Sequence, residues 1–167
     1  MYQIGSLVVY GIHGVCRVVQ METQVIDRKA VTYLVLEPAR QEGTKYMIPT
    51  NNMTAMAQLR PMLTPQELEE MLCSQEVRRG SWHRDENARK QSYRELIACG
   101  DRMKLMQMVH TLYRHKKSQL EAGKKVHMAD DNFLRDAERI LSGEISVIKD
   151  MSSEEAKLYL RNKLKDN

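Results

Sequence analysis

Apolar and polar positions follow two different patterns along this chain, and the change comes after Asn51 and Asn52. Before that point, four short runs rich in β-branched and aromatic residues alternate with Gly, Asp, Pro and Asn. Such runs predict strands, and the residues between them predict turns. The four runs are residues 7–10, 14–19, 31–36 and 45–48. Several strands of this length so close together indicate a small curled sheet or barrel.

Farther along, apolar positions recur every three to four residues, which predicts helices. A helix should start at Thr64, which can act as the N-cap and form a capping box with Glu67. Pro65 then stands at the first helical position, and the helix should run to about Ser74. Four more helices are predicted: from Trp82, or just after it, to Ala98; from near Asp101; after Gly123, continuing or restarting after Gly143; and after the cap at Ser152.

Together the two patterns predict an α+β protein made of two closely packed domains. Residues 1–58 would form a Tudor- or SH3-like β-barrel, and residues 59–167 an all-α helical domain. Twelve methionines occur in the chain, and a promiscuous Met-rich binding surface is one interpretation of them. Methionines at helical spacing more often fill gaps in a core, so we expect Met103, Met106 and Met128 to be buried.

Composition is that of a soluble folded protein, with 42% hydrophobic and 29% charged residues. Three widely spaced cysteines, Cys16, Cys73 and Cys99, fit reduced thiols better than a disulfide framework. The first residues lack the pattern of a signal peptide, and no later segment is apolar enough to span a bilayer. We therefore expect a cytoplasmic protein without a membrane partner.

Positive charge is concentrated in the middle of the chain. Residues 75–127 contain thirteen Lys or Arg against six Asp or Glu, a local charge of +7, whereas the net charge of the whole chain is +4. A block this basic favours a polyanionic partner. The alternative is an ordinary solvated helix surface, because Lys and Arg favour helices and mostly face water.

Trp82, the only tryptophan, lies in this basic block, within residues 78–84. Most tryptophans in domains of this size are largely buried, which is the simplest interpretation. No apolar residue stands three or four positions away, however, as a buried helix would require. An exposed or half-exposed indole among guanidinium groups is suited to contact phosphates and nucleobases.

No motif for catalysis is recognisable. The sequence lacks a phosphate-binding loop, a His-Glu-x-x-His pair, a Cys-x-x-Cys pair and a nucleophile elbow. His110 and His115 are five residues apart, which does not place them on one helix face. We therefore expect no enzyme activity, no cofactor and no metal site.

Several segments resemble the CarD/CdnL transcription regulators of bacteria. Residues 5–15, 33–36 and 47–49 are similar to the start of that family, and the helical half contributes residues 82–84, 100–101, 112–113 and 137–144. The resemblance covers nearly the whole chain. It implies a Tudor-like domain that docks on the β subunit of RNA polymerase, and a helical domain that meets promoter DNA at the upstream edge of the melted region.

By this resemblance, Trp82 is a wedge that enters the minor groove and holds the bubble open, and Arg84 contacts a phosphate. Val35, Met47 and Pro49 match positions implicated in polymerase docking. We also expect a monomer that associates with the nucleoid through the polymerase.

The sequence departs from the family pattern at three positions. Gly11 stands where a proline is usual, Asp85 replaces an arginine of the Trp-x-Arg-Arg motif, and Asn87 replaces a frequent basic residue. Arg89 and Lys90, or Arg78 and Arg79 upstream, are the candidates to replace the lost charge.

Two other functions compete with this interpretation. An adaptor could use the β-domain for protein contact while the helices only support it, without touching DNA. An RNA-binding barrel is disfavoured because the β-half is nearly neutral and lacks a basic, aromatic-rich face. A repair translocase also carries a related docking barrel, but the absence of a phosphate-binding loop excludes that activity.

Overall fold

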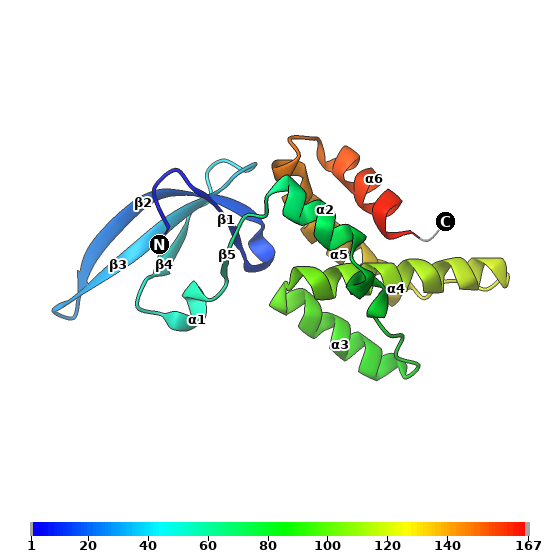
Figure 1. Ribbon diagram of the computed structural model, residues 1–167. Helices are drawn as coiled ribbons and strands as arrows, with labels where there is room; N and C mark the ends of the chain where they lie inside the picture. The colour runs from blue at the N-terminus through cyan, green and yellow to red at the C-terminus, as the bar shows by residue number, and fades with distance from the viewer. Residues whose placement is uncertain (1, 166–167) are drawn as a thin grey trace. The chain divides into compact units, whose positions relative to one another are not determined.

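The chain divides into two compact units that part between Met62 and Leu63, and the computed structural model describes residues 2–165 (Figure 1). The first unit contains an antiparallel sheet, and the second contains the long helices. The predicted α+β class, with a small β-domain followed by an all-α domain, is confirmed.

The first unit is a five-stranded sheet in the order β4-β3-β2-β1-β5. Its strands are β1 (Leu7–Tyr10), β2 (Val15–Ile26), β3 (Lys29–Pro38), β4 (Tyr46–Pro49) and β5 (Leu59–Pro61). A 3-10 turn, η1 (Gly11–His13), follows β1, and a short helix, α1 (Met53–Met56), precedes β5. All four predicted runs are strands. β5 was not predicted because it has only three residues and includes a proline.

One face of this sheet carries the core of the first unit. The core residues alternate along the strands, as side chains of a strand must: Val8, Cys16, Val18, Leu34, Leu36, Ile48 and Leu59. The longest pairing is between β2 and β3, joined at Asp27 and Arg28, both with positive φ. Two such residues in sequence make the tight turn that matches the twist of a two-stranded ribbon.

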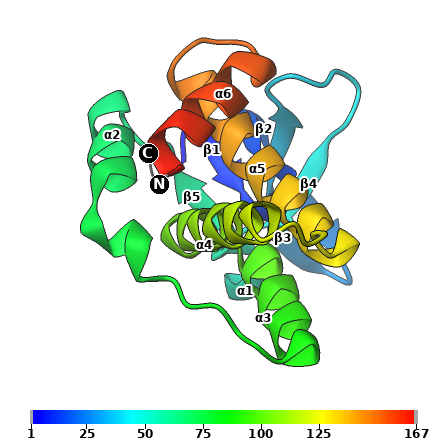
Figure 2. The same cartoon turned by 90° about the vertical axis from the view of Figure 1, so that its right-hand side faces the viewer.

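The second unit is a helical bundle in which α5 packs against both α4 and α6 (Figure 2). Its elements are α2 (Pro65–Cys73), η2 (Gln75–Arg79), α3 (Glu86–Cys99), α4 (Arg102–Glu121), α5 (Met128–Ile148) and α6 (Ser153–Leu164). The capping box predicted at Thr64 is formed, and the cap predicted at Ser152 is a capping box as well. Each satisfies backbone N–H groups that a helix start leaves unpaired.

Three sequence predictions about the helices need correction or completion. α3 begins at Glu86 with Asp85 as its N-cap, so Trp82 lies in a loop and not at the start of a helix. α5 continues through Gly143 without a break. Met128 is 80% exposed because it is the first residue of α5 and faces solvent, so the prediction that it is buried was wrong.

Leucines from α2, α4, α5 and α6 meet in the core of the second unit, where Met106 is buried as predicted and Met103 is half-buried. Within residues 2–165, no helix combines the length and apolar character that crossing a bilayer requires. The same residues contain no cluster of His, Cys, Asp or Glu arranged to hold a metal ion.

Candidate nucleic-acid interface

The loop between η2 and α3, residues 80–85, carries Trp82 and is fixed at both ends. At Gly80 a Cβ atom would lie 2.5 Å from Thr111 Oγ1 and 2.9 Å from the Gln107 carbonyl oxygen, so the backbone here lies directly against α4. At the other end the Asp85 carboxylate accepts a hydrogen bond from the Ala88 N–H at 3.3 Å. Glycine is required for the first contact, and the second is an ordinary N-cap.

The Trp82 side chain is half-buried and packs against the edge of the helical core. Its ring stacks on the His115 ring, with centroids 3.5 Å apart and planes 13° from parallel. The Arg89 Cζ atom lies 4.2 Å from the centroid of the indole. The intermediate exposure agrees with the half-exposed interpretation of Trp82, and the ring is contacted by the apolar core as well as by His115 and Arg89.

Arg89 is held inside the second unit by a two-point ion pair. Its Nε and Nη2 atoms donate to the two Asp130 oxygens at 2.9 and 3.1 Å, and Nη1 donates to the His83 carbonyl oxygen at 3.0 Å. The residue is only 3% exposed. The sequence placed Arg89 among the DNA-binding cations, but its guanidinium is engaged with Asp130 and turned away from solvent. Its guanidinium also contacts the Trp82 ring and the His83 carbonyl oxygen of the loop.

Burial lowers the pKa of His115 below its usual range. The neighbouring charges on Arg89 and His127 lower this pKa further, whereas the Asp130 carboxylate opposes the shift. The ring that stacks on Trp82 is therefore a neutral imidazole at neutral pH.

Of the six residues predicted to contact DNA, four lie on one continuous segment, residues 78–84. Arg78, Arg79 and Arg84 are exposed there beside the half-buried Trp82. Lys90 lies outside this segment on α3, where its Nζ atom pairs with Glu86 at 2.7 Å. Three exposed arginines thus flank Trp82 in the chain, whereas Arg89 contacts the loop from inside the unit and Lys90 is paired on α3.

A hollow of about 260 Å³ lies beside this loop, between α3 and α4. Arg79, His83 and Lys104 line it together with polar groups of the loop. Lys104 was not singled out from the sequence because it is far from Trp82 in the chain. The available signal was its place in the first turn of α4, three residues after the Asp101 cap.

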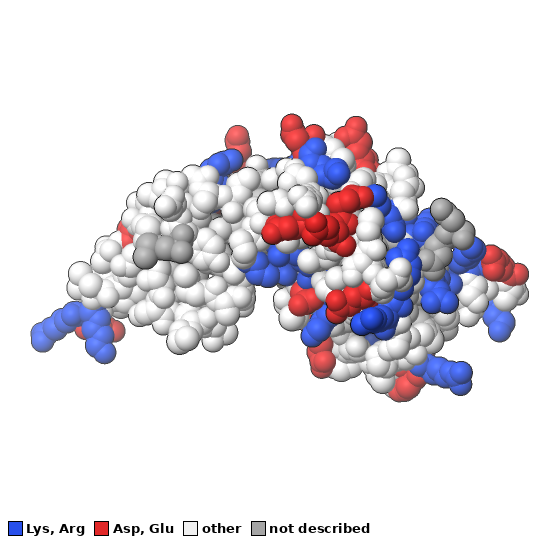
Figure 3. All heavy atoms as spheres, viewed as in Figure 1, with Lys and Arg blue, Asp and Glu red and all other residues white. Residues whose placement is uncertain are grey.

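Charged side chains of both signs cover much of the second unit, whereas the visible face of the first unit is mostly uncharged (Figure 3). The three predicted polymerase-docking residues lie in that first unit, on β3 and the edge strand β4. Val35 and Met47 are direct partners across these strands, and Pro49 pairs with Tyr33. Met47 is 45% exposed, whereas Val35 is only 4% exposed.

Two family models match this chain and together cover almost all of it. Residues 2–62 match the CarD-like/TRCF RID domain, and residues 68–161 match the CarD C-terminal domain. A comparison with curated proteins gave no match. The two matched segments correspond to the sheet unit and the helical unit described above. The chain therefore belongs to the CarD family, whose members are non-enzymatic transcription factors that interact with RNA polymerase.

Proposed function

We propose that this protein docks on the β subunit of RNA polymerase through its sheet unit and stabilises the open promoter complex through Trp82. The indole enters the minor groove at the upstream edge of the melted region and opposes closure of the two strands. The protein acts as a cytoplasmic monomer that reaches the nucleoid with the polymerase.

The single observation that carries this proposal is the set of contacts that hold the Trp82 side chain. A wedge between base steps must withstand a cost of a few kcal/mol for unstacking, so the inserted ring has to be held firmly. His115 stacks on the indole, and Arg89, itself clamped by Asp130, lies over it. A half-exposed ring held by these contacts is pre-organised for insertion.

Phosphate contacts in this proposal come from Arg78, Arg79 and Arg84, which are exposed on both sides of Trp82 in the chain. Contacts between arginines and phosphates fix the position of a protein on the DNA backbone, but they do not recognise the base sequence. Asp85 is occupied as the N-cap of α3, which explains how a carboxylate is tolerated next to this surface. Arg89 and Lys90 are not assigned to phosphates, because carboxylates already engage them.

Docking on the polymerase uses the β4 edge of the sheet. An edge strand presents unpaired backbone groups to which a strand of a partner can be added. Met47 offers an exposed apolar side chain on this edge, and Pro49 ends the strand. Val35 keeps β4 in place from the neighbouring strand.

The decisive experiment measures the lifetime of the open complex on one promoter, with the polymerase of the same bacterium. Trp82→Ala is expected to shorten the lifetime about tenfold, which corresponds to about 1.4 kcal/mol in the barrier to closure. Trp82→Phe, which keeps a flat ring, should lose less. Leu158→Ala is the matched control, because Leu158 is an apolar side chain 59% exposed on α6, and it should leave the lifetime unchanged.

Binding of each variant to the polymerase and its thermal unfolding are measured in parallel. A lifetime unaffected by Trp82→Ala, with polymerase binding retained, would overturn the wedge and favour the adaptor that has no contact with DNA. Loss of the helical fold in Trp82→Ala but not in Trp82→Phe would show that the indole serves mainly as packing.

A further inference from the structure

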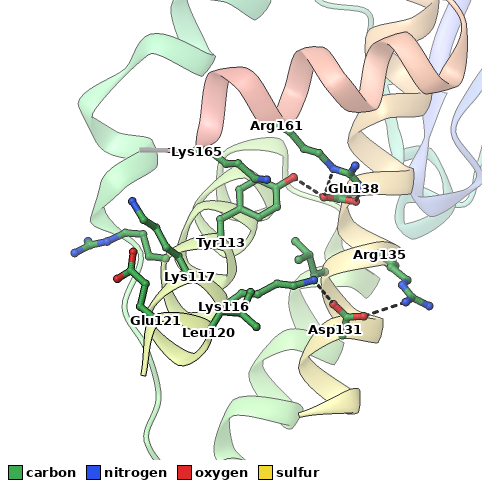
Figure 4. Close-up of a pocket in the computed structure, with 12 residues that line it drawn as sticks. Tyr113, Lys116, Lys117, Leu120, Glu121, Asp131, Arg135, Glu138, Arg161 and Lys165 are labelled. Atoms are coloured by element: carbon green, nitrogen blue, oxygen red, sulfur yellow. Dashed lines mark hydrogen bonds and ion pairs between the residues drawn. The ribbon is translucent and has the colours of Figure 1, made fainter. Parts of the chain in front are cut away.

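A cavity of about 580 Å³ lies in the second unit between α4, α5 and the end of α6 (Figure 4). Neither the Trp82 loop nor the β4 edge contributes to its lining. The size falls within the range of about 300–1,000 Å³ that is usual for small-molecule sites. Six Lys or Arg and three Asp or Glu line the cavity, which leaves a surplus of three positive charges.

Two of the acidic residues in the cavity are already neutralised by neighbours. Asp131 accepts from Lys116 at 2.9 Å and from Arg135 at 3.0 Å. Glu138 accepts from Arg161 at 3.0 Å and from the Tyr113 hydroxyl. These carboxylates are therefore fixed in the wall, and the pKa of Asp131 is lowered chiefly by its hydrogen bond from Lys116.

Two lysines remain as unneutralised donors. Within residues 2–165, neither Lys117 on α4 nor Lys165 after α6 forms an ion pair. The Lys165 Nζ atom lies 5.4 Å from the centroid of the Tyr113 ring. Figure 4 shows both lysines among the side chains that surround the cavity. Ammonium groups that form no ion pair with a carboxylate bind phosphate oxygens readily.

The cavity also has an apolar part. Leu134 and the Tyr113 ring are almost fully buried beneath it, and Leu120, 61% exposed, stands at its side. A site that combines unneutralised lysines with an apolar wall is suited to a ligand with phosphates at one end and a flat, weakly polar group at the other.

We propose that this cavity binds a nucleotide, with its phosphates on Lys117 and Lys165 and its base against Leu120. The proposal does not depend on the role of Trp82. A DNA duplex is the competing polyanion, but its phosphates lie on a convex surface, whereas these lysines surround a hollow. The ligand would also lie close to the wedge, because Lys116 and Asp131 in its wall adjoin His115 and Asp130 in the chain.

Isothermal titration of the full chain tests the proposal, with ATP as the probe and with adenosine, pyrophosphate and a short duplex as comparisons. ATP is expected to bind with one-to-one stoichiometry, and adenosine and pyrophosphate each more weakly, because each keeps only one half of the interaction. The double variant Lys117→Glu/Lys165→Glu should weaken ATP binding about tenfold or more.

The matched control is Lys124→Glu/Lys125→Glu, which makes the same change in charge at exposed lysines outside the cavity. This control should alter ATP affinity by less than about twofold. Equal weakening by the two double variants would mean that diffuse charge holds the ligand, and it would overturn the proposal. So would the absence of ATP binding up to about 1 mM, binding of pyrophosphate as tight as that of ATP, or a response of the cavity variant confined to duplex DNA.

Discussion

At the scale of single residues, the support of Trp82 is a chain of polar side chains. Asp130 holds Arg89, and Arg89 and His115 hold the indole. A buried ion pair of this kind is costly to break from one side, at about 3–5 kcal/mol, because the remaining charge loses its partner. The position of Trp82 therefore depends on residues far from it in sequence.

His115 should make the stability of the second unit depend on pH. Its pKa is lowered in the folded protein, whereas the unfolded chain titrates near pH 6.5. Below that pH the unfolded chain gains a proton that the folded protein resists, so stability is full above pH 6.5 and is lost as pH falls through the folded pKa. His115→Phe keeps a stacking ring but removes this titration.

Urea unfolding at pH 7.5 and pH 5.5 checks this prediction. The wild-type protein should lose more free energy of unfolding between the two values than His115→Phe does. Equal losses of unfolding free energy in the two proteins would mean that protonation of His115 does not affect its stacking on Trp82.

The sequence predicted Trp82 as the central residue and its partial exposure, because no apolar neighbour stood at helical spacing. It could not predict the role of Arg89. A guanidinium in a basic block suggests a phosphate contact, and only the folded chain brings in Asp130, 41 residues away. Tertiary pairing thus decides which cations of a basic block are available to a ligand.

At the scale of elements, local signals in the sequence were strong where a cap or a turn fixed the backbone. The helix caps at Thr64 and Ser152 were predicted from residues close together in the chain. β5 was not predicted because it has only three residues and its pairing with β1 is a long-range contact. The start of α3 was predicted at Trp82 or just after it, whereas its first residue is Glu86 and its cap is Asp85.

Two glycine substitutions should have opposite effects. Gly80→Ala puts a methyl group 2.5 Å from Thr111 Oγ1 and 2.9 Å from a backbone oxygen, so it should destabilise by about 1–3 kcal/mol and displace the Trp82 loop. Gly143→Ala, in α5, has nothing within 4 Å of the new methyl and should stabilise by about 0.5–1 kcal/mol.

Thermal unfolding of the two variants measures both changes in stability. The fluorescence emission of Trp82 reports the displacement of its loop. If Gly80→Ala were as stable as the wild-type protein, the loop would not be anchored on α4 as described.

At the scale of the whole molecule, each unit has its own apolar core. The overall α+β order and the helical second half followed from hydrophobic periodicity. The predicted boundary between residues 58 and 59 would separate Leu59, a buried core residue on β5, from the sheet. Burial of a leucine contributes about 2 kcal/mol, so the choice of boundary has a measurable consequence.

We expect a fragment of residues 1–62 to unfold cooperatively on its own. A fragment of residues 1–58 should be less stable by about 2 kcal/mol or more, because it lacks both Leu59 and the β5 edge. Denaturant unfolding of the two fragments measures the difference. Equal stability would show that β5 is dispensable to the first unit.

The stacking of the only tryptophan on a histidine gives this protein an intrinsic optical probe. Its fluorescence comes from one place in the molecule, where the neighbouring ring and guanidinium set the polarity around the indole. Unlabelled protein can therefore be followed in real time, and a change in the emission spectrum reports any change in the surroundings of this one side chain.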